Sequence, residues 1–162
     1  MTLARSTLLV ATIAWILPLL AGCDSQSGSG GAGGGGSTLP TVPMQLGSKS
    51  FTLEVADNDA TRQYGLMRRD SMPSDHGMIF VFNREAPLTF WMKDTRIPLD
   101  IIFVNSNGTV VSVKQMKPYD QDHTPSDGDV QYAIELNKGS AESAGVKVGM
   151  TLKLPPGLKA KD

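Results

Sequence analysis

One stretch of the chain, Phe90 to Val104, restricts the possible folds more than any other. It reads FWMKDTRIPLDIIFV and joins two apolar runs through a short polar elbow, Lys93–Arg96. The second run, Ile101–Val104, is apolar at every position, whereas a strand with one exposed face would alternate apolar and polar residues. The pattern therefore predicts a strand covered on both faces. Charged groups in the elbow beside it must be paired, hydrogen-bonded or exposed in a cleft.

Other segments predict further strands and two short helices. Ser50–Ala56 alternates as a half-buried strand does, and Met78–Phe82 is a second unbroken apolar run. Asn83–Pro87 is expected to turn the chain into a strand at Phe90–Met92, and the Asn107-Gly108 pair is typical of a hairpin. The remaining predicted strands are Thr109–Met116, Gln131–Leu136 and Met150–Leu154, with helices at Ala60–Met67 and Gly139–Ala144.

About seven strands with little helix indicate an α+β fold with mostly antiparallel pairing, and the sheet could close into a small barrel.

The first residues have the features of a secretory signal. Arg5 supplies a positive charge, and the apolar run Leu8–Leu20 is too short to be a comfortable membrane span. The sequence Leu20-Ala21-Gly22-Cys23 resembles the lipobox of bacterial lipoproteins, in which cleavage precedes the cysteine and its sulfur receives a diacylglycerol. Since Cys23 is the only cysteine of the chain, we predict lipidation there. An ordinary signal peptide, or an uncleaved anchor with a chance cysteine, is the alternative.

These features predict the organisation of the whole chain. A signal peptide at 1–22 is followed by Cys23 and a linker rich in Gly, Ser and Pro up to residue 43, which lacks the apolar content to fold. A single domain is expected at 44–156 and a tail at 157–162. The lipid would hold the protein at the periplasmic face of the inner or outer membrane. A net charge of -1 without a cluster of basic residues argues against nucleic acid as a partner.

Several segments of the domain form a recognisable set. They are Arg62-x-x-Gly65-Leu66-Met67-x-Arg69, Gly77–Phe82, Phe90–Phe103, and Tyr132–Glu135 with the turn Gly139–Gly145. Together they resemble a bacterial and archaeal family, the domain of unknown function 192, over roughly Phe51–Leu154. The resemblance implies an α+β fold with a barrel-like sheet and no settled activity. Asp94 stands where the family usually has Asn, and Met150 where an acidic residue is common. Asp94 weakens the case for anion binding at the elbow.

The sequence offers little for nucleophilic or metal chemistry. No G-x-S-x-G segment is present, a lipidated Cys23 has no free thiol, and His76 and His123 lie in loops with no context typical of a catalytic triad. H-E-x-x-H is absent, and two isolated histidines make a weak zinc set. Thioethers suit Cu(I), but core packing is the favoured role of the methionines because they lie in apolar patterns. We predict no metal and no cofactor. The methionines concerned are Met67, Met78, Met92 and Met116.

Carboxylates near the elbow are the remaining catalytic candidates. Glu54 and Glu135 each interrupt a strand, and both could face a cleft and pair with Arg62, Arg69 or Lys93. Paired carboxylates suit acid–base work. Asp100, just after the elbow, could instead cap it by accepting hydrogen bonds from backbone N–H groups. Structural ion pairs and caps are favoured over catalysis.

Trp91 is the strongest candidate for a binding residue. On a strand it points away from the face shared by Phe90 and Met92, so it could wall a cleft for a ligand or peptide beside Lys93 and Arg96. It would be equally natural as a core residue. The leading hypothesis is a membrane-tethered binding or accessory module for a small ligand or peptide. The predicted binding residues are Arg62, Arg69, Trp91, Lys93, Asp94, Asp100 and Glu135.

Two other functions remain open. One is an envelope hydrolase that uses Glu135 or Asp100 as its base, and the other is a structural or assembly factor with a protein partner.

Overall fold

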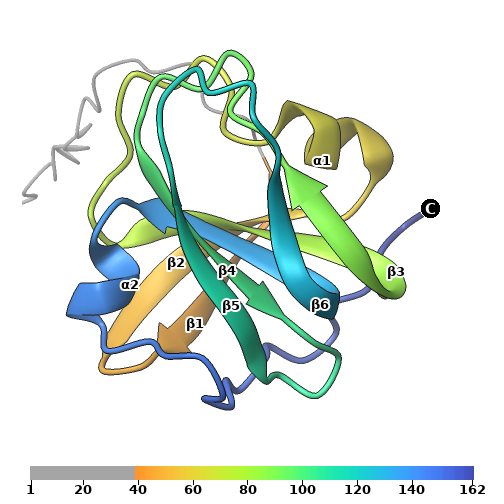
Figure 1. Ribbon diagram of the computed structural model, residues 1–162. Coiled ribbons are helices and arrows are strands. Elements are labelled where there is room, and N and C mark those ends of the chain that lie inside the picture. The colour runs from red at the N-terminus through yellow and green to blue at the C-terminus, as the bar shows by residue number, and fades with distance from the viewer. Residues whose placement is uncertain (1–38) are drawn as a thin grey trace, which may run out of the picture. The chain divides into compact units, whose positions relative to one another are not determined.

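The computed structural model describes residues 39–162. The predicted signal segment, Cys23 and most of the predicted linker lie outside the described residues. Six strands form one sheet in the order β1-β2-β3-β6-β4-β5 (Figure 1). All neighbours pair antiparallel except β2 and β3, which are parallel and are joined through helix α1. The elements are β1 Thr41–Leu46, β2 Lys49–Ala56, α1 Asp59–Tyr64, β3 His76–Phe90, β4 Leu99–Val104, β5 Val110–Met116, β6 Thr124–Asn137 and α2 Ser140–Ser143.

The predicted closure of the sheet into a barrel is wrong. β1 and β5 are the two edges of the sheet, and they do not pair with each other. The chain after α2 occupies the edge groups instead. The backbone N–H of Ser48, in the β1–β2 turn, donates to the carbonyl of Ala144 at 2.8 Å, and the N–H of Val110 donates to the carbonyl of Met150 at 2.8 Å. Irregular backbone of the later chain therefore satisfies one donor in the turn beside edge strand β1 and one at the start of edge strand β5.

Two strand predictions are wrong, and one strand was not predicted. Met150–Leu154 is not a strand, since only a single bridge joins Thr151 to Thr109. Phe90–Met92 is not a separate strand either, because β3 runs through the predicted turn at Asn83–Pro87 and ends at Phe90. β3 and β6 bend together where their register shifts between Val81 and Ala86 (Figure 1). A strand that the sequence did not predict, β1, begins at Thr41 and includes the last three residues of the predicted linker.

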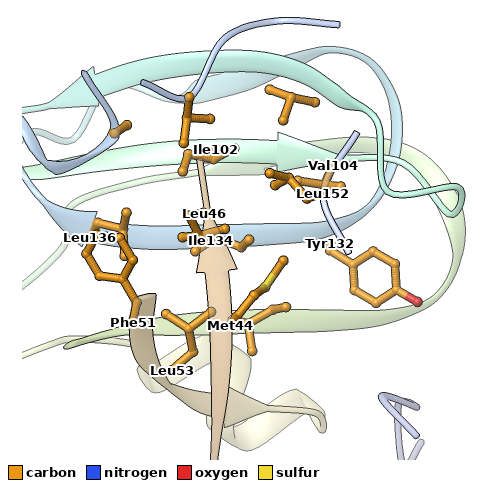
Figure 2. Close-up of a cluster of buried hydrophobic side chains, with 14 of the residues drawn as sticks. Met44, Leu46, Phe51, Leu53, Ile102, Val104, Tyr132, Ile134, Leu136 and Leu152 are labelled. Atoms are coloured by element: carbon orange, nitrogen blue, oxygen red, sulfur yellow. The ribbon is translucent and has the colours of Figure 1, made fainter. Parts of the chain in front are cut away.

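The two-sided burial predicted for Ile101–Val104 is confirmed, because every residue of β4 is buried. Ile102 and Val104 point into a first core cluster, inside the curve of the sheet, which Figure 2 shows with side chains from β1, β2 and β6. Leu99, Ile101 and Phe103 point into a second cluster on the opposite face. The second cluster is covered by side chains of the loops that carry the candidate site, namely Leu66, Met72, Met92 and Ile97.

Helix α1 is held by its ends. Asn58 caps it, since its side chain accepts from the N–H of Thr61 at 3.0 Å, and the Thr61 hydroxyl oxygen accepts from the N–H of Asn58 at 3.2 Å. Gly65 ends it at a positive φ of 47°, a conformation that glycine adopts more readily than other residues. The helix is therefore shorter than the predicted Ala60–Met67, and the chain leaves it toward the second cluster.

Candidate functional site

The elbow between β3 and β4 is joined to two neighbouring loops, the one after α1 and the one between β5 and β6. The N–H of Arg68 donates to the carbonyl of Asp94 at 2.8 Å, and the N–H of Tyr119 donates to the carbonyl of Thr95 at 3.0 Å. A third bond, of 3.0 Å, runs from the N–H of Met92 to the carbonyl of Asp120. The loops gather at one end of the sheet, at the top of Figure 1. Backbone bonds thus tie three separate segments into one frame.

Each of these loops contains one residue with strained backbone. Among residues 39–162 only three residues other than glycine have positive φ: Arg68 at 62°, Asp94 at 52° and Tyr119 at 59°. This conformation costs roughly 1–2 kcal/mol for most side chains, and Asn and Asp tolerate it best. The left-handed backbone at position 94 therefore explains why Asp can stand where Asn is usual. Strain of this kind persists only where surrounding contacts impose it, and it concentrates at ligand-binding and active sites.

Trp91 is exposed at this end of the molecule. Its side chain is 45% exposed, whereas Met92 beside it is 2% exposed, so the two point to opposite sides as predicted. The ammonium nitrogen of Lys93 lies 5.3 Å from the centre of the Trp91 ring, within the range of a cation–π interaction. The ring of His123 lies 6.3 Å away. We call the exposed side chains here the Trp91 surface: Arg68, Trp91, Lys93, Arg96, Tyr119 and His123.

Three members of this surface were not predicted from the sequence to belong to a binding site. His123 was expected only to be a solvated loop residue, and Arg68 and Tyr119 were not singled out. Tyr119 is 58% exposed, and it reaches the elbow through the backbone bond to Thr95. No local pattern reports such a bond, because it joins residues that are distant in sequence. Arg96 is held by an ion pair with Asp70, with 2.6 Å between Nη1 and Oδ1.

A second charged group lies under the loops, on the face of the second core cluster. Arg69 holds Glu54 through two hydrogen bonds, of 2.5 Å and 2.7 Å. Glu135 lies in the same row of the sheet, since both Glu54 and Glu135 are in register with Met78. Burial raises the pKa of Glu135 to about 8, although the positive charge of Arg69 opposes the shift. Of the pairings that the sequence allowed, the structure thus forms the one between Glu54 and Arg69.

Asp100 does not cap the elbow, which corrects that prediction. Its Oδ2 accepts from the N–H of Ala141 at 2.9 Å, so it caps α2 instead. Asp100 is in register with Leu136, whereas Glu135 is in register with Ile101. The two carboxylates are therefore on opposite faces of the sheet and cannot act together on one substrate.

Arg62 belongs to neither group. Its Nη1 donates to the carbonyl of Val81 at 2.8 Å, and its guanidinium pairs with Asp59 and Asp162. It also lies 5.0 Å from the ring centre of Phe82. These contacts hold the end of the chain against α1 rather than contributing to the Trp91 surface.

The other residues weighed for catalysis or metal binding are explained by local contacts. His76 bonds its neighbour Asp75 at 2.9 Å. Met78, Met92 and Met116 are buried in the second cluster, as expected for core packing. In the part of the chain from residue 39 onward, no three His, Cys, Asp or Glu side chains gather to hold a metal ion.

No helix among residues 39–162 is long and apolar enough to cross a membrane.

Comparisons with known proteins agree with this fold. The sequence profile of DUF192, described as "Uncharacterized ACR", matches residues 42–154. A protein of Sinorhizobium meliloti 1021, provisionally described as a transcription regulator, is 35% identical, with a TM-score of 0.64 over 70% of this chain and 91% of that one. A protein of unknown function from Novosphingobium aromaticivorans DSM 12444 is 33% identical, with a TM-score of 0.67 over 76% of this chain and 91% of that one. No curated protein matches.

Proposed function

This chain belongs to the DUF192 family of uncharacterised proteins, and we propose that it is a lipid-anchored protein of the cell envelope whose domain binds a small ligand or peptide at the Trp91 surface. The observation that carries the proposal is the exposure of Trp91, at 45%, with the Lys93 ammonium 5.3 Å from its ring. Trp and Tyr supply large, flat contact areas and are enriched among the residues that contribute most to binding.

The frame around Trp91 supports a binding role. Three backbone hydrogen bonds join the loops that carry the surface, and the ion pair of Arg96 with Asp70 adds a fourth link. A surface fixed before binding loses less conformational freedom when a ligand arrives, which favours affinity. The strained residues Arg68, Asp94 and Tyr119 fit the same role, because strain accumulates where geometry is needed for function.

The tether rests on the sequence before residue 39. The segment Leu8–Leu20, followed by Leu20-Ala21-Gly22-Cys23, supports processing as a lipoprotein. The Gly- and Ser-rich composition between Asp24 and the start of β1 at Thr41 predicts a root-mean-square reach of roughly 23 Å for this linker. That distance would hold the domain clear of the lipid headgroups while keeping it near ligands of the envelope.

Fluorescence of Trp91 tests the binding proposal directly. In a chain processed at Cys23, Trp91 is the only tryptophan, because Trp15 leaves with the signal segment. The processed protein, purified in detergent, is titrated with short peptides, envelope glycans and peptidoglycan fragments. A ligand should shift the emission, and at a hundredfold excess over its Kd it should stabilise the fold by about 2.7 kcal/mol.

Two variants separate the Trp91 surface from exposed aromatic area in general. Trp91→Ala should abolish binding in calorimetry while unfolding remains cooperative. Tyr64→Ala removes a side chain that is 50% exposed on α1, outside the Trp91 surface, and should leave binding unchanged. If Trp91→Ala binds as well as the parent, the ligand site lies elsewhere.

A second function, an envelope hydrolase, rests on Glu135 alone. A carboxyl group with a pKa of about 8 is protonated near neutral pH and suits general acid–base chemistry. Glu135→Gln should then erase turnover of a hydrolysed ligand with little effect on its affinity, and unchanged turnover would remove Glu135 from the mechanism. A third function, an assembly factor, predicts a persistent crosslink to one protein in envelope preparations, which neither of the others requires.

A further inference from the structure

A pocket lies beside α2, away from the residues of the Trp91 surface. It has a volume of about 330 Å³ and lies between the later part of β5 and the chain of α2 and the residues after it. Asp100 forms part of its wall, together with Val113, Glu142 and Lys147. The pocket is therefore open to small molecules and has a buried carboxyl group in its lining.

Only one of the two carboxylate oxygens of Asp100 has a hydrogen-bond partner. The residue is 2% exposed, and its Oδ2 accepts one hydrogen bond, from the N–H of Ala141. Its Oδ1 is the one buried side-chain oxygen or nitrogen among residues 39–162 that has no hydrogen-bond partner. Buried polar groups nearly always have partners, and an exception in a pocket wall calls for a donor.

The positive side chains of the wall do not supply that donor. The ammonium of Lys114 is engaged by the carbonyl of Pro125 and the carboxylate of Asp127, both at 2.6 Å. Lys147 is exposed and makes no ion pair with the residues from 39 onward. Glu142, also in the wall and exposed, adds a second negative charge.

We propose that this pocket binds a small molecule through a primary ammonium group, which donates a hydrogen bond to Oδ1 of Asp100. An ammonium group has three N–H donors and one positive charge, so it satisfies both the missing hydrogen bond and the buried negative charge. The carboxylate of Glu142 in the wall attracts the same group, and the ammonium of Lys147 in the same wall opposes that attraction. This site is independent of ligand binding at the Trp91 surface.

Two probe ions of equal charge test the proposal. Methylammonium donates hydrogen bonds, whereas tetramethylammonium has no N–H group. Each is titrated into the full chain at constant ionic strength, and the amide signals of Ala141, Val113 and Gly145 are followed by NMR. We expect saturable shifts with methylammonium only. Equal shifts with both ions, or with neither, would overturn the proposal.

Substitutions then assign the effect to Asp100. Asp100→Asn keeps the carbonyl oxygen that caps Ala141 but replaces the other oxygen with an NH₂ group, so α2 stays capped and methylammonium should bind at least about tenfold more weakly. Val113→Phe fills the pocket and leaves Asp100 intact, and it should weaken methylammonium binding at least as much. Lys147→Ala, in the same wall, should retain it. Undiminished binding in both Asp100→Asn and Val113→Phe would place the ion elsewhere.

Discussion

The guanidinium of Arg69 donates two hydrogen bonds to the carboxylate of Glu54, one from each terminal nitrogen, at 2.5 Å and 2.7 Å. The two residues come from the loop after α1 and from β2, so this pair fastens the loop to the sheet. Among residues 39–162, Arg69 is also the residue whose positive charge opposes the rise in the pKa of Glu135. The same loop contains Arg68, whose backbone N–H donates a hydrogen bond to the elbow. The buried ion pair is therefore connected, through this loop, to the loops that carry the Trp91 surface.

Removing Arg69 should therefore be costly. The side chains of Arg69 and Glu54 are only 20% and 14% exposed, and loss of one partner leaves the other charge without compensation. We expect Arg69→Ala to lower the free energy of unfolding by about 3 kcal/mol in urea titrations. Arg96→Ala is the matched control, because its pair with Asp70 is 45% and 80% exposed, and it should change stability by less than about 1 kcal/mol. Similar losses in both variants would contradict the structural role of the Arg69 pair.

Glu135 should make stability depend on pH. Its pKa of about 8 in the folded chain lies above the ordinary value of 4.5, so between these values the folded state keeps a proton that the unfolded state has lost. The free energy of unfolding should then fall as pH rises through this window, by up to about 1.4 kcal/mol per pH unit from this group. Glu135→Gln, which stays neutral, should remove this contribution. Its free energy of unfolding should therefore increase relative to that of the parent protein as pH rises. Parallel profiles for the two proteins between pH 5 and 8 would show that the buried carboxyl does not titrate as described.

Gly77 should be irreplaceable for steric reasons. A Cβ at this position of β3 would lie 2.5 Å from the backbone oxygen of Glu135 and 2.6 Å from the Leu136 side chain. Because backbone of the neighbouring strand cannot move aside, we expect Gly77→Ala to destabilise the fold by about 3 kcal/mol in thermal or urea unfolding. Gly128→Ala is the control, since its added Cβ would meet only a Val111 methyl group at 3.5 Å, and it should be tolerated. Equal tolerance of both substitutions would contradict the close approach of β3 and β6.

The proposed lipid anchor depends on one atom, the sulfur of Cys23. Cys23→Ala should release the protein from the membrane fraction without changing the thermal stability of the domain, because the residue precedes β1, the first strand of the described domain. Fractionation followed by mass spectrometry of the N-terminal peptide measures both the location and the acyl mass. Unchanged membrane association of Cys23→Ala would require another anchor.

Local sequence patterns were enough to predict the features that depend on neighbours along the chain. Unbroken apolar runs predicted the buried strands around Ile79 and Ile102, and the alternation at Phe51–Val55 predicted β2. The existence of a helix after β2 was predicted too, although α1 ends three residues before the predicted Met67. These signals are local, because solvent exposure of successive side chains and backbone conformation leave a pattern in the residues themselves. The family motifs could also be recognised in the sequence, because each lies within one continuous segment.

How those segments meet depends on contacts between residues that are distant along the chain. The parallel pairing of β2 with β3, and the chain after α2 that occupies the sheet edges, have no local signature. The same holds for the site. Asp100 and Glu135 are 35 residues apart in number and nearly adjacent in the sheet, yet the register of β4 against β6 sends them to opposite faces. A register shift of one residue would reverse this result without changing any local preference, because side chains alternate between faces along a strand.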